Sequence, residues 1–154
     1  MAARQWEAAE AYHLKALEME PGFLGVLIQL AELYVATGRV DQAVSTWQRV
    51  LGVLDLPEQA EEIGRRFQAE GSDGYFRTLL ELSDEIGLDD FYRAYLHAGL
   101  GDKETAFRLL ESAIDRKLNG TSFLACWPVW DPIRDDPRFD DLVARLDIPP
   151  TSTD

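Results

Sequence analysis

The sequence predicts an all-α fold, a solenoid of antiparallel helix pairs that ends in a short helical C-terminal cap. Three observations predict this fold. Residues 6–21 match residues 40–55 at a spacing of 34. Apolar side chains recur at three- and four-residue steps, which is the period of one helix face. A later block repeats the same pattern at a shift of 63 residues. Repeats of this length are stacked helix pairs, so we expect residues 1–154 to form one domain.

Residues 4–21 are predicted to be a half repeat. They match only the second helix of the repeat that follows, through the pairs Trp6/Val40, Glu7/Asp41, Ala9/Ala43, His13/Trp47, Ala16/Val50 and Leu17/Leu51. Residues 1–3 are too few to supply a first helix, so we expect either a longer parent protein or another element that completes the repeat. In both cases an apolar face of this helix is left uncovered.

Residues 22–55 are predicted to be a full repeat. Leu27, Leu30, Ala31 and Tyr34 share one stripe of a first helix, because they recur at three- and four-residue steps. Gly38 ends that helix, since glycine adopts the left-handed backbone at little steric cost. A second helix then follows, with its inner face formed by Ala43, Trp47 and Val50.

This block resembles the tetratricopeptide repeat family. The residues that carry the likeness are Leu27, Leu30, Ala31, Tyr34, Gly38, Ala43, Trp47 and Val50. The resemblance implies a right-handed solenoid whose concave groove is lined by the first helix of each pair. It also implies a protein-binding module.

Two further units are predicted downstream. Residues 56–88 form a degenerate repeat, in which Pro57 suits a helix start and residues 70–74 form a break. Residues 89–118 form another repeat, because four of its residues match Ala31, Gly38, Ala43 and Val50 at the shift of 63. These four residues are Ala94, Gly101, Ala106 and Ala113.

Residues 119–150 are predicted to be a C-terminal cap of two short helices. Asp131-Pro132 and Asp136-Pro137 each combine an aspartate that can accept free amides at a helix start with a proline that suits the first turn. Phe139, Leu142, Val143 and Leu146 form the buried side of the second helix, about residues 137–146, and seal the last repeat. Residues 128–139 also resemble a closing segment after the last repeats of multidomain bacterial signalling and regulatory proteins, which implies a C-terminal module.

Net charge limits the partners. The chain carries −13, from 28 acidic and 15 basic residues. A field of this sign opposes binding to nucleic acid and to anionic membranes. No apolar run approaches the ~20 residues of a membrane span. We therefore expect no nucleic acid and no membrane, and a protein or peptide partner that is basic and has apolar anchors. The alternative is that acidic helices only keep the protein in solution.

Chemistry-bearing residues do not assemble into a site. His13 and His97 lie on separate predicted helices, and the single cysteine, Cys126, is distant from both, so we expect no metal site. The single cysteine cannot form an internal disulfide, which fits a cytoplasmic location. The aspartates of the cap lack the pattern of a calcium loop, and residues 71–74 lack the lysine of a phosphate loop. We expect no cofactor and no enzyme activity.

A partner-binding surface is predicted on the outward residues of the first helices. If the chain is such a solenoid, Ile28, Glu32 and Val35 line the groove in the full repeat. In the later repeat Tyr95 lines it, with Phe91 or Tyr92 near the helix start. The alternative for the two tyrosines is packing between helices. The predicted function is a non-enzymatic interaction module whose groove holds a peptide or a neighbouring domain. The alternative function is self-assembly, a homodimer formed through the half repeat by Trp6, Ala9, His13 and Ala16.

Overall fold

The structure is a computed structural model that describes residues 3–146. These residues form α-helices and two short 3₁₀ turns, and they contain no strand. The fold of the described residues is an all-α helical repeat. By its internal contacts the chain divides into two compact units, Met1–Leu79 and Leu80–Asp154. The boundary falls within the predicted degenerate repeat, and each unit is described by itself.

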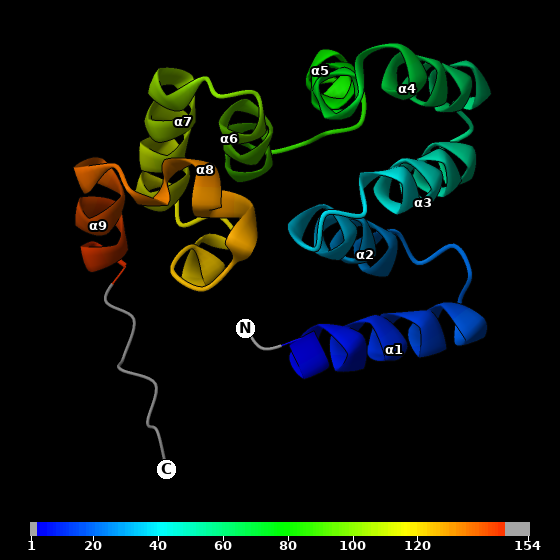
Figure 1. Cartoon of the computed structure of the whole chain (residues 1–154), viewed down its shortest axis with the longest axis horizontal. Helices are drawn as coiled ribbons and strands as arrows, with labels where there is room; N and C mark the ends of the chain where they lie inside the picture. The colour runs from blue at the N-terminus through cyan, green and yellow to red at the C-terminus, as the bar shows by residue number, and fades with distance from the viewer. Residues whose placement is uncertain (1–2, 147–154) are drawn as a thin grey trace. The chain divides into compact units, whose positions relative to one another are not determined.

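The first unit contains four complete helices in which neighbours in sequence pack side by side (Figure 1). They are α1 (Ala3–Met19), α2 (Leu24–Ala36), α3 (Val40–Val53) and α4 (Pro57–Glu70), and α5 (Ser72–Leu82) begins in this unit. The apolar stripes of α2 and α3 form the core as predicted. The buried residues of these two helices are Leu27, Leu30, Ala31, Leu33, Tyr34, Ala43, Val44, Thr46, Trp47, Val50 and Leu51.

The turn between α2 and α3 explains why these helices form a pair. Gly38 has a φ of +76°, a conformation that residues with a Cβ avoid, and the amide of Arg39 donates to the carbonyl of Tyr34 at 2.7 Å. The chain can therefore reverse within three residues. Ala31 and Ala43 are fully buried, as expected where two helix backbones approach closely.

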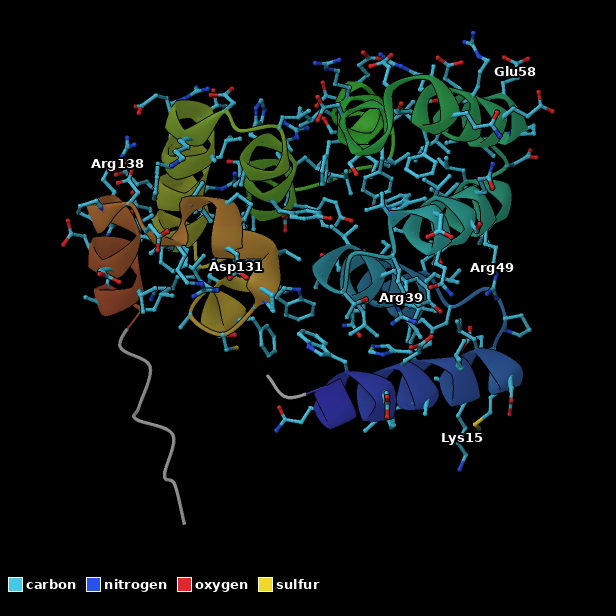
Figure 2. All side chains as sticks on the ribbon, viewed as in Figure 1. Lys15, Arg39, Arg49, Glu58, Asp131 and Arg138 are labelled. Atoms are coloured by element: carbon cyan, nitrogen blue, oxygen red, sulfur yellow. The ribbon has the colours of Figure 1, made fainter. Side chains whose placement is uncertain are left out.

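A polar cluster fixes α1 against α2. The Tyr34 hydroxyl donates to Glu10 Oε1 at 3.2 Å, and Arg39 Nη2 lies 2.9 Å from Glu10 Oε2. The Arg39 guanidinium also stacks on the Tyr34 ring, 4.7 Å from its centroid. Figure 2 shows Arg39 on the side of α2 that faces α1, while Lys15 points away from α2. The contact thus sets which face of α1 is covered.

Gly74 permits the close approach of α5 to α4. A Cβ at this position would lie 2.3 Å from the Arg66 carbonyl oxygen, closer than real Cβ contacts come. Gly71, between the two helices, has a φ of +66°. The two glycines explain why a single residue, Gly71, joins α4 to α5 in place of a longer loop.

The second unit repeats the helix pair of the first. It contains α6 (Asp90–Gly99) and α7 (Lys103–Asp115), with Asp89 and Asp102 as N-caps that accept from backbone amides. Gly101 has a φ of +81°, and the amide of Asp102 donates to the carbonyl of His97, as Arg39 does to Tyr34. The backbone turn therefore repeats at the predicted shift of 63 residues.

The cap packs on α6 and α7 within this unit. It consists of the 3₁₀ turns Thr121–Phe123 and Pro128–Trp130 and the helices α8 (Asp131–Arg134) and α9 (Pro137–Ala144). Phe139 and Leu142 are buried, whereas Val143 and Leu146 are only half-buried. Residues 147–150, the end of the predicted cap, lie outside the described residues. Arg134 ties the cap together, because its guanidinium donates to the carbonyls of Ala125 and Trp127 at 2.8 and 2.9 Å.

Only one of the two predicted aspartate caps is present. Asp136 accepts from the amide of Arg138 at 3.1 Å at the start of α9. Hydrogen bonds from Arg138 lower the pKa of Asp136 to about 2. The prediction for Asp131 was wrong: α8 has no side-chain cap, since the preceding 3₁₀ turn runs directly into it, and Asp131 accepts from Arg134 Nε instead.

Candidate functional site

The candidate site is the outward face of α2. One stripe of this helix is buried between α1 and α3. The opposite stripe carries Ile28, Glu32 and Val35, which are half-buried, and it begins at the exposed Gly25. The three predicted residues therefore lie together on one face, because positions 28, 32 and 35 are spaced as one side of a helix requires.

The helix that carries this face is firmly held. Leu27 and Ala31 are fully buried beneath it, and Trp47 of α3 is fully buried beside it. The pair Glu10–Arg39 and the Tyr34 hydroxyl join the α2–α3 hairpin to α1. Burial, followed by the charge of Glu10, raises the pKa of Tyr34, so its hydroxyl stays protonated and can donate. A site on a well-packed helix needs little ordering on binding.

The electrostatic character of this face comes from Glu32, the single charged residue of α2. The sequence of the first unit, residues 1–79, has 12 acidic and 7 basic side chains. The face itself is otherwise apolar or uncharged. It therefore combines apolar contact area with one carboxylate, in an acidic surrounding.

The second set of predicted residues is packed inside the second unit. Tyr92 and Tyr95 are 8% and 3% exposed, and their rings meet edge to face with centroids 5.2 Å apart. Trp130 of the cap covers the same helix, with its ring 5.1 Å from that of Phe91 and 6.4 Å from that of Tyr95. Of the two alternatives for these tyrosines, the structure places them in packing positions within this unit.

Sequence reasoning missed Trp130 as the residue that covers α6. Trp130 is 1% exposed and sits at the end of the 3₁₀ turn Pro128–Trp130. A Cβ at Gly120 would lie 2.9 Å from the Phe91 ring, so the chain before the cap also closes on this helix. The available signal was a tryptophan next to the Asp131-Pro132 helix start, but nothing local indicated which helix it would cover.

The residues predicted for self-association lie on the half-buried side of α1. Trp6, Ala9, His13 and Ala16 are all half-buried. His13 Nδ1 lies 2.6 Å from the Ala9 carbonyl oxygen, and its Nε2 lies 3.2 Å from Gln29 Oε1 of α2. This side of α1 thus faces α2.

The most exposed apolar side chains of α1 lie elsewhere on the helix. Tyr12 and Met19 are 75% and 85% exposed, and Leu14 is also exposed. Tyr12 and Met19 share one side of α1, which is not the stripe of His13, so this open side differs from the one that the sequence pairs predicted.

The described residues contain no group of three or more His, Cys, Asp or Glu that could hold a metal ion. His97 Nδ1 lies 3.1 Å from Asp102 Oδ2, and hydrogen bonds from Thr105 lower the pKa of Asp102. This pair joins the end of α6 to the start of α7, next to the Gly101 turn. Within residues 3–146, no helix has the length and apolarity needed to cross a membrane.

Comparison with known proteins supports the repeat. Residues 1–63 match a family model described as tetratricopeptide repeat. The match spans α1, α2, α3 and the first half of α4 and therefore includes the candidate site. A tetratricopeptide repeat indicates a protein–protein interaction module, and such repeats are typically non-catalytic. No curated protein and no solved structure matches the chain.

Proposed function

We propose that the chain is a non-enzymatic interaction module that holds a peptide or a neighbouring domain on the face formed by Ile28, Glu32 and Val35. The observation that carries the proposal is that Ile28, Glu32 and Val35 share one half-buried face of a helix whose opposite stripe is packed. The match to the tetratricopeptide repeat over residues 1–63 supports it. The module is the C-terminal part of a larger regulatory protein, as the resemblance of residues 128–139 implies.

The partner in this proposal is basic and has apolar anchors. Ile28 and Val35 offer apolar contact, and Glu32 offers a carboxylate. The net charge of −13 raises the rate at which a cationic segment reaches the protein and disfavours an anionic one. The proposal also places the protein in the cytoplasm, which is supported by the single cysteine, Cys126.

A displayed peptide library selected on the whole chain tests this function. Selected peptides should bind the chain in a calorimetric titration and lose at least tenfold in affinity for an Ile28→Asp variant. Val53→Asp is the control, because Val53, like Ile28, is a β-branched apolar side chain of the first unit, and it is 50% exposed at the end of α3. Circular dichroism shows whether each variant is folded. Peptides that bind Ile28→Asp and the parent chain equally would contradict the proposal.

Self-assembly is the second candidate function, because Tyr12 and Met19 leave α1 with an exposed apolar side. Contiguous exposed apolar patches often mark an interface, and Tyr12 and Met19, seven residues apart, lie on the same side of α1. Light scattering over a range of protein concentrations measures the solution mass. A dimer should form as the concentration rises and should be lost when Tyr12 and Met19 are both replaced by glutamate. A mass that stays monomeric at all concentrations would contradict this candidate.

A further inference from the structure

We propose that the first unit has a second interaction surface, at the edge where the loop between α1 and α2 meets the end of α3. This surface binds a segment of a partner protein that carries apolar anchors between cationic side chains. Its apolar residues, called the loop edge, are Phe23, Val53 and Leu54. The loop edge is separate from the outward face of α2, so each surface can be present without the other.

Two contacts hold the loop against the end of α3. Arg49 Nη2 donates to the carbonyl of Pro21 at 3.3 Å. A Cβ added at Gly22 would lie 3.6 Å from Cγ2 of Val53, which is ordinary van der Waals contact. Figure 1 shows the ends of α1 and α3 on the same side of this unit, and Figure 2 shows Arg49 on that side. The loop and the end of α3 therefore form one continuous surface.

The apolar side chains of the loop edge are open to water. Phe23, Val53 and Leu54 are 48%, 50% and 38% exposed. Pro21 and Pro57, which lie close to them in the chain, are also exposed. Apolar side chains that are grouped in this way on a surface are more typical of an interaction site than scattered ones.

The backbone under the loop edge is fixed. Asp55 follows α3 with a φ of +59°, a left-handed conformation that aspartate tolerates better than most residues. The amide of Leu56 donates to the carbonyl of Leu51 at 2.8 Å, and in the loop the amide of Phe23 donates to the carbonyl of Glu20 at 3.1 Å. A surface that is already ordered loses little conformational entropy on binding.

Carboxylates flank the loop edge on both of its segments. In the described part of the chain these side chains form no hydrogen bond and no ion pair, so they are available to a partner. Available carboxylates attract a cationic segment and repel an anionic one. The four exposed residues are Glu18 and Glu20 beside the loop and Asp55 and Glu58 after α3.

These charges decide between two kinds of occupant, a second copy of the chain and a different protein segment. In a symmetric dimer the same surface meets itself, so the four carboxylates of one copy would face those of the other. Like charges that meet across an interface oppose binding. A cationic segment pairs with the carboxylates instead, and its apolar side chains cover Phe23, Val53 and Leu54.

Three short synthetic peptides test the loop edge on the isotope-labelled whole chain by amide shift perturbation. The first alternates Leu-Phe pairs with Lys pairs, the second has Glu in place of Lys, and the third has Ser in place of Leu and Phe. The first peptide should shift amides of residues 20–23 and 52–58, with a dissociation constant on the order of 100 μM. The second and the third should each bind about tenfold more weakly, because one lacks the charge and the other the apolar anchors.

Two leucine variants form a matched pair. Leu54 and Leu14 are 38% and 42% exposed, and Leu14 lies within α1, outside the loop edge. Leu54→Ser should weaken the first peptide about fivefold, because apolar contact area is lost, whereas Leu14→Ser should leave its affinity unchanged. Circular dichroism shows whether each variant is folded, and Phe23→Ser repeats the test at the other segment of the loop edge.

A second pair of variants tests the charges. Glu20→Gln combined with Asp55→Asn should weaken the first peptide about fivefold at low salt, as two exposed charge pairs allow. Glu7→Gln combined with Glu111→Gln changes the net charge equally at exposed positions elsewhere, and it should change the affinity less than about twofold. The difference between the two double variants should shrink as salt is added.

Three results would overturn the loop edge as a binding surface. The first is the absence of shifts in residues 20–23 and 52–58 at concentrations of the first peptide to about 1 mM. The second is equal affinity for the Lys and Glu peptides, or an equal loss in Leu54→Ser and Leu14→Ser. The third is a doubled mass in light scattering that Leu54→Ser returns to a monomer, because a second copy then occupies the surface.

The same measurements separate the loop edge from the outward face of α2. A first peptide that shifts residues 28–35 and loses affinity in Ile28→Asp supports the α2 face and contradicts the loop edge as its site. A peptide that depends on Leu54 and not on Ile28 supports the loop edge alone. Val53→Asp stays a control for the α2 face, because Val53 belongs to the loop edge and not to that face.

Discussion

Replacement of Gly74 by alanine should destabilise the first unit through a contact between α4 and α5. The added Cβ would lie 2.3 Å from the Arg66 carbonyl oxygen and 2.7 Å from its carbon. Real Cβ contacts stay beyond 3.0 Å, so α5 must move by about 0.7 Å or more relative to α4. The obstacle is backbone, which cannot turn aside as a flexible side chain can.

The magnitude follows from two opposing terms. Overpacking of a close contact costs up to about 3 kcal/mol. Alanine also lowers the free energy of a helix by about 0.5–1 kcal/mol relative to glycine. The expected net loss in the free energy of unfolding is therefore about 2 kcal/mol. At a urea dependence of about 2 kcal/mol per molar, the unfolding midpoint falls by about 1 M.

Gly52→Ala is the matched control for this prediction. Gly52 lies in α3, and nothing lies within 4 Å of the position of its Cβ. Only the helix preference of alanine over glycine acts there, so the free energy of unfolding of the variant should rise by about 0.5–1 kcal/mol. Urea titrations followed by circular dichroism measure both variants, and hydrogen exchange of residues 57–82 locates the effect. A Gly74→Ala chain as stable as the parent would refute the reasoning.

Two further predictions concern the helix-pair turns and the contact of α1. Gly38→Ala and Gly101→Ala should each lower the free energy of unfolding by about 1–2 kcal/mol, because both positions have a positive φ. Nothing lies within 4 Å of either Cβ, so the backbone strain is the same in both variants. Unequal losses in urea titrations would contradict the equivalence of the two turns. The hydrogen bond from Arg39 lowers the pKa of Glu10, so the stability that this pair contributes is present above the ordinary pKa of 4.5 and is lost as pH falls through the lowered value. A Glu10→Gln chain should therefore be less stable than the parent at pH 7 and equally stable at pH 2. Thermal unfolding of both chains across this pH range measures the difference.

The helix pair of α2 and α3 could be predicted from the sequence because its determinants are local. The stripe of Leu27, Ala31 and Tyr34 follows from helix geometry, and Gly38 marks the turn. These patterns lie within a few residues of one another, and Ala31 and Gly38 also match Ala94 and Gly101 at the shift of 63 residues. The outward position of Ile28 follows from the same geometry, since Ile28 lies on the side of the helix opposite the buried stripe.

The role of Tyr95 could not be predicted in the same way. Its spacing on α6 is that of an outward groove residue, as for Glu32 on α2. It is buried because Trp130, 35 positions later, packs against it. A single sequence carries no local record of which distant side chain covers which helix face.

The sequence by itself determined that the chain is helical, where the helix pairs reverse and which residues form their inner stripes, because helix period and turn preference act over a few residues. Tertiary structure alone decided which outward faces stay open. The Glu10–Arg39 contact selected the covered side of α1, and Trp130 covered α6. The physical reason is that burial depends on what packs from elsewhere in the chain, and helix period does not specify that.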